Sequence, residues 1–373
     1  MSAAGAATPA AAASTPDSSV HAPDSSVRGH ADGAGECSYP ASATDATGTE
    51  VTVEAEPDSV VALGASTAQT IWELDAEEKV VGVSQFATYL DGAEDVETVT
   101  TTEGLSTNVQ TEVIVGLDPD VVLAANVYNT TNSQSLQQLR DAGITVYTFE
   151  AAGSIEDVYA KTERIGHLVG ACESANTTVA EMRSTVDTVS AAVSGEDRPR
   201  VLYPQGDGFA PGPNTFIGGL IDAAGGTNVV ANANATSTYP QLSGEFVVEQ
   251  DPEWLIVSGS QEQMDQDPKS LAPNNTAIRN TTAWEEGNFV VVDNNHISQP
   301  APRIVSPLRK MAQAFHPEAY AAANTTTVST DTPGADETDT PDGTETEAPG
   351  QPGFGAGVAL AALLGLLALA RRR

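Results

Sequence analysis

Short runs of apolar and β-branched residues alternate along the chain with stretches of helical periodicity. Helices are predicted at 67–74 and 216–224. The strand-like runs are SVVAL (59–63), VVGV (80–83), VVLA (121–124) and ITVY (144–147), and then RVLY (200–203), WLIV (254–257) and FVVVD (289–293). Continuous apolar strands separated by helices are typical of parallel sheets that are covered on both faces. The pattern therefore predicts an α/β fold.

An internal repeat divides this pattern into two similar parts. Residues 112–123 read EVIVGLDPDVVL and residues 245–256 read EFVVEQDPEWLI, so Glu112 corresponds to Glu245 and Asp118 to Asp251. Each copy predicts a short helix that begins near Glu, ends at Asp-Pro and leads into a buried strand. We therefore expect two Rossmann-like α/β lobes.

One long amphipathic helix is predicted between the lobes. Apolar residues recur at spacings of three and four from Val179 to Val193, with no helix breaker before Gly195. A helix of about 20 residues spans about 30 Å, which suits a rigid connection between two domains. The expected organisation is a disordered or uncertain leader at 1–48, an N-terminal lobe at 49–173, the interlobe helix at 174–195, a C-terminal lobe at 196–322, a disordered stalk at 323–351 and a terminal signal at 352–373.

The C-terminal end predicts attachment to a membrane. Residues 354–370 are an uncharged run that is followed by three arginines, and about 26 Å of helix is just enough to cross a hydrocarbon core. Terminal arginines stay in the cytoplasm, which places the preceding chain outside the cell. The Thr-, Asp- and Pro-rich stalk cannot bury enough apolar surface to fold. The leader lacks the apolar core of a signal peptide, so the sequence leaves its role open.

The charge balance excludes one class of partner. Asp and Glu number 51 against 16 Lys and Arg, which gives a formal net charge of −35. A nucleic-acid interface needs the opposite balance, because it neutralises phosphates. Repulsion among so many carboxylates is screened only in concentrated salt, so the composition predicts a salt-adapted protein.

The cysteines and sequons fit an extracellular location. Cys37 and Cys172 lack metal-ligand spacing, and we expect no metal site; two buried thiols and a disulfide remain equally open. Six Asn-x-Ser/Thr sequons agree with exposure outside the cell and are candidate glycosylation sites: Asn129, Asn176, Asn234, Asn274, Asn280 and Asn324.

Two sequence features resemble known families. Pro352-Gly353-Phe354, between the stalk and the apolar run, resembles the sorting signal of haloarchaeal surface proteins, which implies cleavage and replacement by a lipid anchor. Over about 270 residues, the segments PDSVVALGASTAQTIWELDAEEKVVGV, LRDAGITVYTF, AAGGTNVV and SGEFVVEQDPEWLIV resemble the class III solute-binding proteins of ATP-driven importers. The resemblance implies a monomeric, C-terminally anchored protein on the outer face of the membrane that works with a permease and its ATPase.

Candidate ligand contacts follow the predicted strands. Parallel sheets bind ligands in crevices at the carboxyl ends of their strands. In a chain with only 5% aromatic residues, the aromatics on such loops are candidates for the walls of a pocket for a large flat ligand, although each could also be ordinary packing. The resemblance raises Tyr89, Tyr239 and His296 above the rest. The full set is Tyr89, Phe209, Tyr239, Asn294 and His296.

Glu112 and Glu245 occupy equivalent positions on the two lobes. A first-turn carboxylate is favourable to the helix dipole, and that structural role is one interpretation. The family resemblance implies the other, in which each Glu engages arginines of the permease, because charged rim pairs set orientation and encounter rate.

Binding rather than catalysis is the expected activity. No Gly-rich phosphate loop, nucleophile elbow or paired His and carboxylate occurs, so we expect no catalytic residues and no cofactor. An adhesion protein would favour β-sandwich spacing. Anionic ferric chelates favour pockets lined by Arg or Lys, and the aromatic loops carry no basic residue except Arg303. A neutral corrinoid, cobalamin, is therefore the first choice of ligand, with a ferric siderophore or haem as the alternative.

Overall fold

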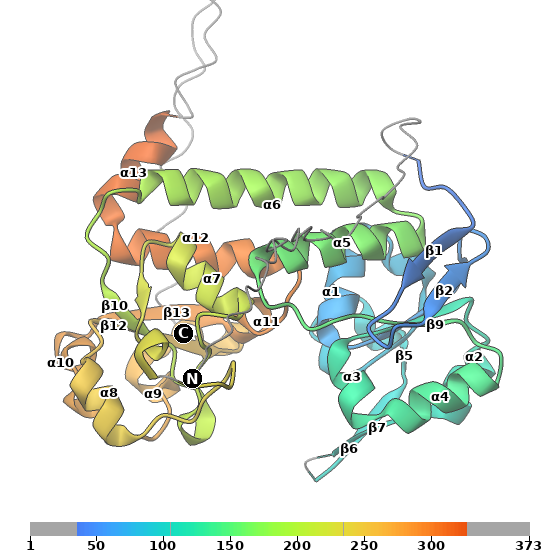
Figure 1. Ribbon diagram of the computed structural model, residues 1–373, viewed down its shortest axis with the longest axis horizontal. Helices are drawn as coiled ribbons and strands as arrows, with labels where there is room; N and C mark the ends of the chain where they lie inside the picture. Colours follow the sequence, from blue (N-terminus) through green and yellow to red (C-terminus); the bar gives the residue numbers. More distant parts are fainter. Residues whose placement is uncertain (1–35, 105, 234, 327–373) are drawn as a thin grey trace, which may run out of the picture. The chain divides into compact units, whose positions relative to one another are not determined.

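The computed structural model describes residues 36–104, 106–233 and 235–326. The chain divides into two units, residues 1–328 and 329–373, and every described residue belongs to the first. The expected sorting signal and most of the expected stalk and leader lie outside the described residues. Within that first unit the backbone forms two α/β halves, each built on a parallel sheet (Figure 1).

The first half contains a five-stranded sheet of order β5-β4-β3-β8-β9, and all its pairings are parallel. Alternate residues of β3 face opposite sides: Val60 and Ala62 pack with α1 and α5, whereas Val61 and Leu63 pack with α2, α3 and α4. Helices on both faces explain why these strands are continuously apolar. The elements are β3 (Val60–Leu63), α1 (Ala65–Glu73), β4 (Val80–Val83), β5 (Glu97–Thr98), α2 (Thr111–Leu117), β8 (Val121–Ala124), α3 (Asn126–Thr131), α4 (Ser133–Asp141), β9 (Val146–Thr148) and α5 (Ile155–Val169).

The second half contains a four-stranded parallel sheet of order β11-β10-β12-β13. Val201 and Ile256 face a core shared with α7 and α12, whereas Leu202 and Leu255 face α8 and α10. The elements are β10 (Arg200–Leu202), α7 (Phe216–Ala223), β11 (Thr227–Asn228), α8 (Gly244–Gln250), β12 (Trp254–Gly259), α9 (Pro268–Leu271), α10 (Thr282–Glu286), β13 (Phe289–Asp293), α11 (Asn294–Ile297), α12 (Val305–Phe315) and α13 (Pro317–Thr326). The doubly covered parallel sheets confirm the predicted α/β class.

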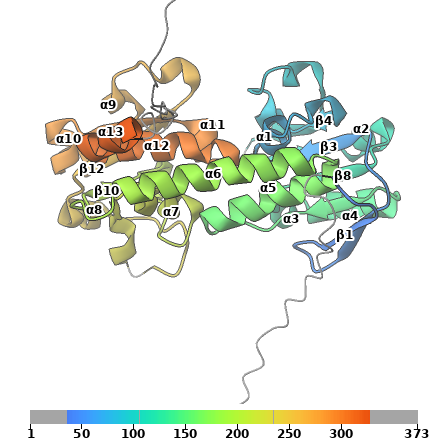
Figure 2. The same ribbon diagram turned by 90° about the horizontal axis from the view of Figure 1, so that it is seen from above.

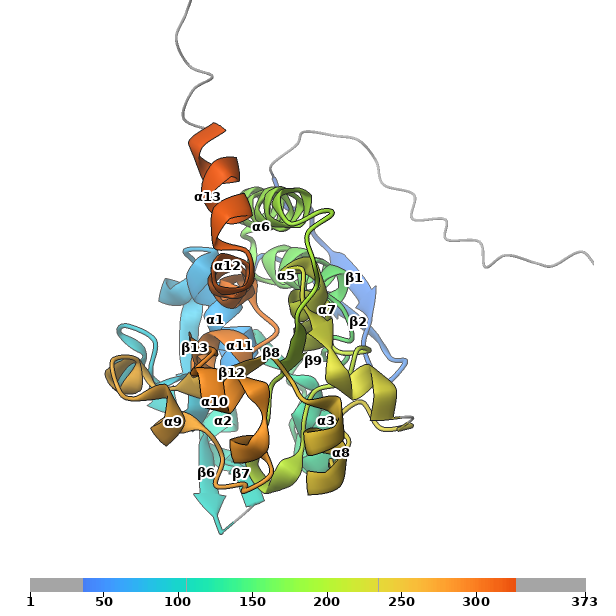
Figure 3. The same ribbon diagram turned by 90° about the vertical axis from the view of Figure 1, so that its left-hand side faces the viewer.

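The connecting helix α6 (Cys172–Ala192) packs on α5 of the first half and on α7, α12 and α13 of the second. Figures 1 and 2 show α5 and α6 lying side by side, and Figure 3 shows α13 beside α6. Its buried residues include Val179, Met182 and Val189, as the spacing predicts. The expected range of 174–195 is wrong at both ends. Gly170, with φ of +84°, ends α5 and lets α6 begin at Cys172, and the helix stops before Gly195, with φ of +92°.

Residues 36–48 do not belong to a disordered leader, which corrects the expected boundary. β1 (Ala41–Thr44) pairs antiparallel with β2 (Glu50–Val53). Asp45 accepts hydrogen bonds from the backbone N–H groups of Thr47 and Thr49 in the intervening turn, and it pairs with Arg140 at 3.2 Å. The pair with Arg140 of α4 connects this turn to the body of the first half.

The remaining outcomes concern the two cysteines, the ends of the fold and one unexpected hairpin. Cys37 and Cys172 form a disulfide, one of the two possibilities that the sequence left open. α13 continues to Thr326, past the expected start of the stalk at 323. A second hairpin, β6 (Thr100–Glu103) and β7 (Ser106–Val109), was not expected from the pattern. In the described ranges, no helix combines the length and the apolar character that a bilayer crossing requires.

Candidate ligand-binding site

The carboxyl end of β3 leads directly into α1 through Gly64. The φ of Gly64 is +123°, and a Cβ at this position would lie 2.7 Å from the Cβ of Ala125. A side chain is therefore excluded on both conformational and steric grounds. This tight turn places the first residues of α1 at the edge of the sheet where parallel α/β folds bind ligands.

Gln69 of α1 connects Tyr89 of the first half with the backbone of the segment that carries Asn294 and His296 in the second. Its side-chain Nε2 donates to the hydroxyl of Tyr89 at 2.6 Å and to the backbone carbonyl oxygen of Asn295 at 3.0 Å. The Oε1 of Gln69 and the Oγ1 of Thr67 are buried without a hydrogen-bond partner in the part of the chain that the structure describes. Such groups need polar partners, because a buried unsatisfied oxygen costs about 1–3 kcal/mol.

Tyr89 is a neutral donor and acceptor at this position. It follows the 3₁₀ helix η2 (Gln85–Ala87) and is half-buried. Burial raises the pKa of Tyr89 above its ordinary value of 10.0, and the hydrogen bond from Gln69 opposes that rise. The neighbouring Phe86 leaves 51% of its surface exposed, so this loop presents a second aromatic ring to solvent.

In the second half, hydroxyl and amide groups from three strand ends form a chain of hydrogen bonds. The Tyr203 hydroxyl lies 2.9 Å from Ser258 Oγ, and Ser258 Oγ donates to Asn294 Oδ1 at 3.4 Å. Tyr239 is close enough to Tyr203 for that ring to add to the rise of the Tyr239 pKa, which burial chiefly causes. The hydrogen bonds therefore connect Asn294 with Tyr203 and Ser258, two residues that the sequence pattern did not predict, and Tyr239 lies near Tyr203.

His296 is half-buried on α11, immediately after β13. Burial lowers its pKa below the ordinary value of 6.5; Asp293 opposes this effect and Arg303 adds to it. The imidazole is therefore mainly neutral at pH 7, with one ring nitrogen free of a proton. It can accept a hydrogen bond or coordinate the metal of a bound ligand.

Two basic side chains join the halves and are already engaged. Arg303, in the 3₁₀ helix η8 (Pro302–Ile304), donates from Nε to Glu73 Oε1 at 2.7 Å. Lys161 of α5 is buried and donates to Ser66 Oγ at 2.7 Å and to the Pro300 carbonyl oxygen at 3.3 Å. The sequence did not predict these contacts, because the partners are 95 to 230 residues away and no local pattern marks them.

Phe209 lies apart from the other predicted residues. It forms an isolated antiparallel bridge with Gln241 and is 41% exposed. It borders a crevice of about 10 Å³ that also contains Leu242 and Ile278, which is space for one water molecule at most. In the described ranges, no hydrogen bond or ring contact connects it with Tyr89, Asn294 or His296.

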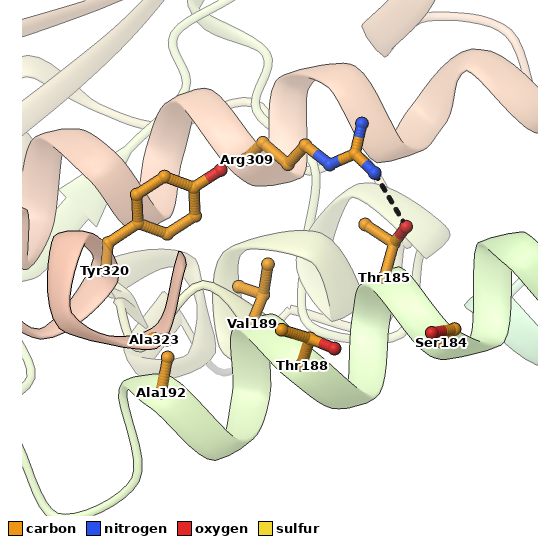
Figure 4. Close-up of a pocket in the computed structure, with 8 residues that line it drawn as sticks. All are labelled: Ser184, Thr185, Thr188, Val189, Ala192, Arg309, Tyr320 and Ala323. Carbon is orange, nitrogen blue, oxygen red and sulfur yellow. Dashed lines mark hydrogen bonds between the residues drawn. The ribbon is translucent and has the colours of Figure 1, made fainter. Parts of the chain in front are cut away.

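A larger cavity, of about 170 Å³, lies between α6, α12 and α13 and contains none of the predicted ligand contacts. Figure 4 shows Arg309 reaching across it, and its Nη2 donates to Thr185 Oγ1 at 2.9 Å. Pockets for drug-sized ligands usually measure about 300–1,000 Å³. This cavity is too small for a corrinoid or a haem.

Glu112 and Glu245 are exposed at the second position of α2 and α8. Each helix ends at an aspartate in the left-handed region, Asp118 with φ of 48° and Asp251 with φ of 40°. The internal repeat therefore corresponds to two copies of one local structure, one on each half.

The sequons differ in accessibility. Asn176, Asn274 and Asn280 are exposed and Asn129 is partly buried. Asn324 lies in the last turns of α13, and Asn234 lies outside the described residues. Glycosylation of any of them stays a prediction.

Comparison with known proteins gives one consistent family. The periplasmic binding protein model matches residues 60–296, and the PGF-CTERM motif matches residues 351–373. A cobalamin-binding protein of Halobacterium salinarum is 48% identical over 349 residues, which cover 92% of this chain and 91% of that protein.

Two solved structures share the fold. The haem-binding protein RhuT of Roseiflexus sp. RS-1 has a TM-score of 0.58 at 23% identity and covers 71% of this chain and 99% of its own. The vitamin B12-binding protein BtuF of Vibrio cholerae has a TM-score of 0.57 at 16% identity and covers 72% and 98%. The PGF-CTERM motif indicates C-terminal anchoring outside the cell. The chain belongs to the periplasmic binding protein family and is a class III solute-binding protein of the haloarchaeal type.

Proposed function

We propose that this protein captures cobalamin outside the cell and delivers it to an ABC-importer permease. The observation that carries this proposal is the 48% identity, over 92% of the chain, to a protein named for binding cobalamin. The proposed site lies between the two halves, where Tyr89, Tyr239, Asn294 and His296 are the contacts; Phe209, which lies apart from them, is a peripheral contact. The protein binds and releases its ligand without catalysing a reaction and without a cofactor of its own.

The charge of the site supports a neutral ligand. The guanidinium of Arg303 is paired with Glu73 at 2.7 Å, and burial lowers the pKa of Lys161 to about 7. The Arg303 charge is paired, and Lys161 is buried, only partly protonated at pH 7 and hydrogen-bonded within the protein, so both are poor partners for an anionic chelate. The hydroxyl and amide groups of Tyr89, Tyr203 and Asn294 suit a ligand that is rimmed with amides, and aromatic rings suit its apolar faces.

Calorimetric titration in molar potassium chloride tests the ligand. We expect cyanocobalamin to bind more tightly than ferric citrate, ferrichrome or haemin. Tyr239→Leu removes a ring from the proposed site and should weaken cyanocobalamin binding about tenfold or more, equal to about 1.4 kcal/mol. Tyr320→Leu, beside α6, is the matched control and should bind normally. If haemin or a ferric chelate binds more tightly than cyanocobalamin, the cobalamin proposal is wrong and the ligand is the iron-containing alternative.

We also propose that Glu112 and Glu245 dock the loaded protein onto basic residues of the permease. Their exposure and their equivalent positions on the two halves support two-point docking. Glu112→Gln combined with Glu245→Gln should leave cyanocobalamin affinity unchanged and reduce uptake of labelled cobalamin by cells. Normal uptake would instead assign both carboxylates to the helix dipole.

The oligomeric state completes the proposal. We propose that the protein acts as a monomer, because one chain supplies both halves of the site. Light scattering of the purified chain in molar salt should give the mass of one protomer, and a ligand-dependent dimer would contradict this.

A further inference from the structure

An exposed valine accompanies each of the two docking carboxylates. Val115 of α2 is 46% exposed and Val248 of α8 is 43% exposed. They correspond to each other in the internal repeat, three residues after Glu112 and Glu245. The burial pattern is the same in both helices, since Ile114 and Val247, one residue earlier, are buried.

Exposure of these valines has no explanation within the described fold. Only five large apolar side chains of the described residues are exposed: Phe86, Val115, Val127, Phe209 and Val248. Two of the five occupy equivalent places on the two halves. Valine is also a poor choice for an exposed helix position, because its branched side chain loses rotamer freedom there. Neither core packing nor helix propensity therefore accounts for the pair.

The carboxylate and the valine lie on one helix face. Residues three apart are neighbours on the surface of a helix, with Cβ atoms about 5–6 Å apart. On α2 the next residue is Gly116, and a Cβ there would meet no atom within 4 Å, so the surface beside Val115 is open. On α8 the corresponding residue is the exposed Glu249. Each half thus presents a carboxylate beside an accessible apolar side chain.

This combination complements one kind of protein surface. Arg carries a planar cationic head on an apolar stem of three methylene groups. The head can pair with the carboxylate while the stem, or an apolar neighbour of the Arg, covers the valine. The chemistry fits a partner surface with an Arg among aliphatic side chains, presented once to each half.

We propose that Val115 and Val248 are the apolar components of the permease-docking surface, each forming a unit with Glu112 or Glu245. This inference rests on the docking role of the two carboxylates proposed above, and it adds the residues that maintain affinity when charge pairing is weak. The occupant is the extracellular face of the permease, at basic residues flanked by aliphatic side chains.

The valines should contribute most to docking in concentrated salt, where charge pairing is weak. The Debye length falls from about 10 Å at 0.1 M to about 3 Å at 1 M, so exposed ion pairs contribute little in concentrated salt. Burial of apolar surface is not screened by salt. A protein with a net charge of −35 that is adapted to salt therefore needs an apolar contact if docking is to persist.

The test measures binding of the cyanocobalamin-loaded full chain to proteoliposomes that contain the cognate permease and ATPase, at 0.5 M and 3 M potassium chloride. Val115→Thr with Val248→Thr keeps the shape of both side chains and replaces a methyl by a hydroxyl. We expect this pair to lose affinity for the permease about tenfold at 3 M, equal to about 1.4 kcal/mol. Melting temperature and cyanocobalamin affinity should stay unchanged. Val127→Thr, on α3 and 53% exposed, is the matched control and should dock normally.

The carboxylate variants separate this inference from the proposal on which it rests. Glu112→Gln with Glu245→Gln should weaken docking more at 0.5 M than at 3 M. The valine pair should show the opposite salt dependence, with the larger effect at 3 M. If the carboxylate pair weakens docking and the valine pair does not at either salt, the valine inference is wrong and the docking proposal stands. If neither pair affects docking, both are wrong. The pair Val115→Ala and Val248→Ala provides a second removal of the apolar contact, should the threonine variants unfold.

Discussion

The Nζ of Lys161 in α5 lies 3.3 Å from the backbone carbonyl oxygen of Pro300, so a buried lysine of the first half is bonded to the second. Its other hydrogen bond goes to Ser66 Oγ at 2.7 Å, and the ring of Phe149 lies 5.7 Å from it. No carboxylate of the described residues forms an ion pair with Lys161. Burial alone lowers its pKa from 10.5 to about 7.

This lysine should make stability rise with pH above neutrality. Between pH 7 and about 10.5 the unfolded chain holds a proton on Lys161 that the folded chain has lost, so raising the pH favours the folded state. The slope from this one group approaches about 1.4 kcal/mol per pH unit. Urea unfolding from pH 6.5 to 9 should show this rise in the wild type and lose it in Lys161→Met. Lys269→Met, at an exposed lysine, is the control. If stability rises as steeply with pH in Lys161→Met as in the wild type, the buried lysine is not the cause.

The ion pair between Glu73 and Arg303 should weaken the binding of anionic ligands. Both side chains are about a third exposed, so their pairing contributes at most about 1 kcal/mol to stability. Glu73→Gln would remove the carboxylate that pairs with Arg303. The guanidinium of Arg303, near Tyr89 and His296, would then carry an unpaired positive charge. Calorimetry should then show ferric citrate binding more tightly than to the wild type, with cyanocobalamin affinity nearly unchanged. Stability should change by less than about 1 kcal/mol. Unchanged ferric citrate binding would show that Arg303 is remote from the ligand.

The disulfide should stabilise the first half by closing a long loop. Cys37 and Cys172 are separated by 135 residues and connect the segment before β1 to the first residue of α6. In the chain-entropy model a loop of this size contributes about 3–5 kcal/mol. Reduction by a phosphine should lower the melting temperature of the wild type, and Cys37→Ser with Cys172→Ser should melt at the lower temperature with or without the reductant. A reductant that lowers the melting temperature of the double variant as well would contradict this assignment.

Stability should increase with salt. At 51 acidic and 16 basic residues, repulsion among carboxylates outweighs attraction between unlike charges, and both are screened as the Debye length falls from about 10 Å at 0.1 M to about 3 Å at 1 M. We expect the melting temperature to rise by roughly 10 °C between 0.2 M and 3 M potassium chloride, which corresponds to a few kcal/mol. Equal melting temperatures would show that the charges are too far apart to matter. Sucrose at matched viscosity is the control for non-ionic effects.

Local patterns in the sequence were sufficient for the framework. Continuous apolar runs predicted the strands of both parallel sheets except the two-residue edge strands β5 and β11, because a strand covered on both faces has no polar side. The Asp-Pro repeat predicted the equivalence of α2 and α8, because Pro restricts the residue before it and the helix must stop there. The spacing of Val179, Met182 and Val189 predicted α6. Each of these features depends on residues within a few turns of one another.

The contacts that position the candidate site needed the tertiary structure. Gln69 and Asn295 are 226 residues apart, and Glu73 and Arg303 are 230 apart. Nothing local distinguishes these polar residues from their exposed neighbours, since their partners are chosen by where the two sheets place their strand ends. The β1–β2 hairpin was missed for the same reason, because residues 36–48 gain order from the disulfide and from Arg140 rather than from their own composition. Sequence periodicity reports which side of an element is buried, whereas only the assembled chain decides what each polar group meets there.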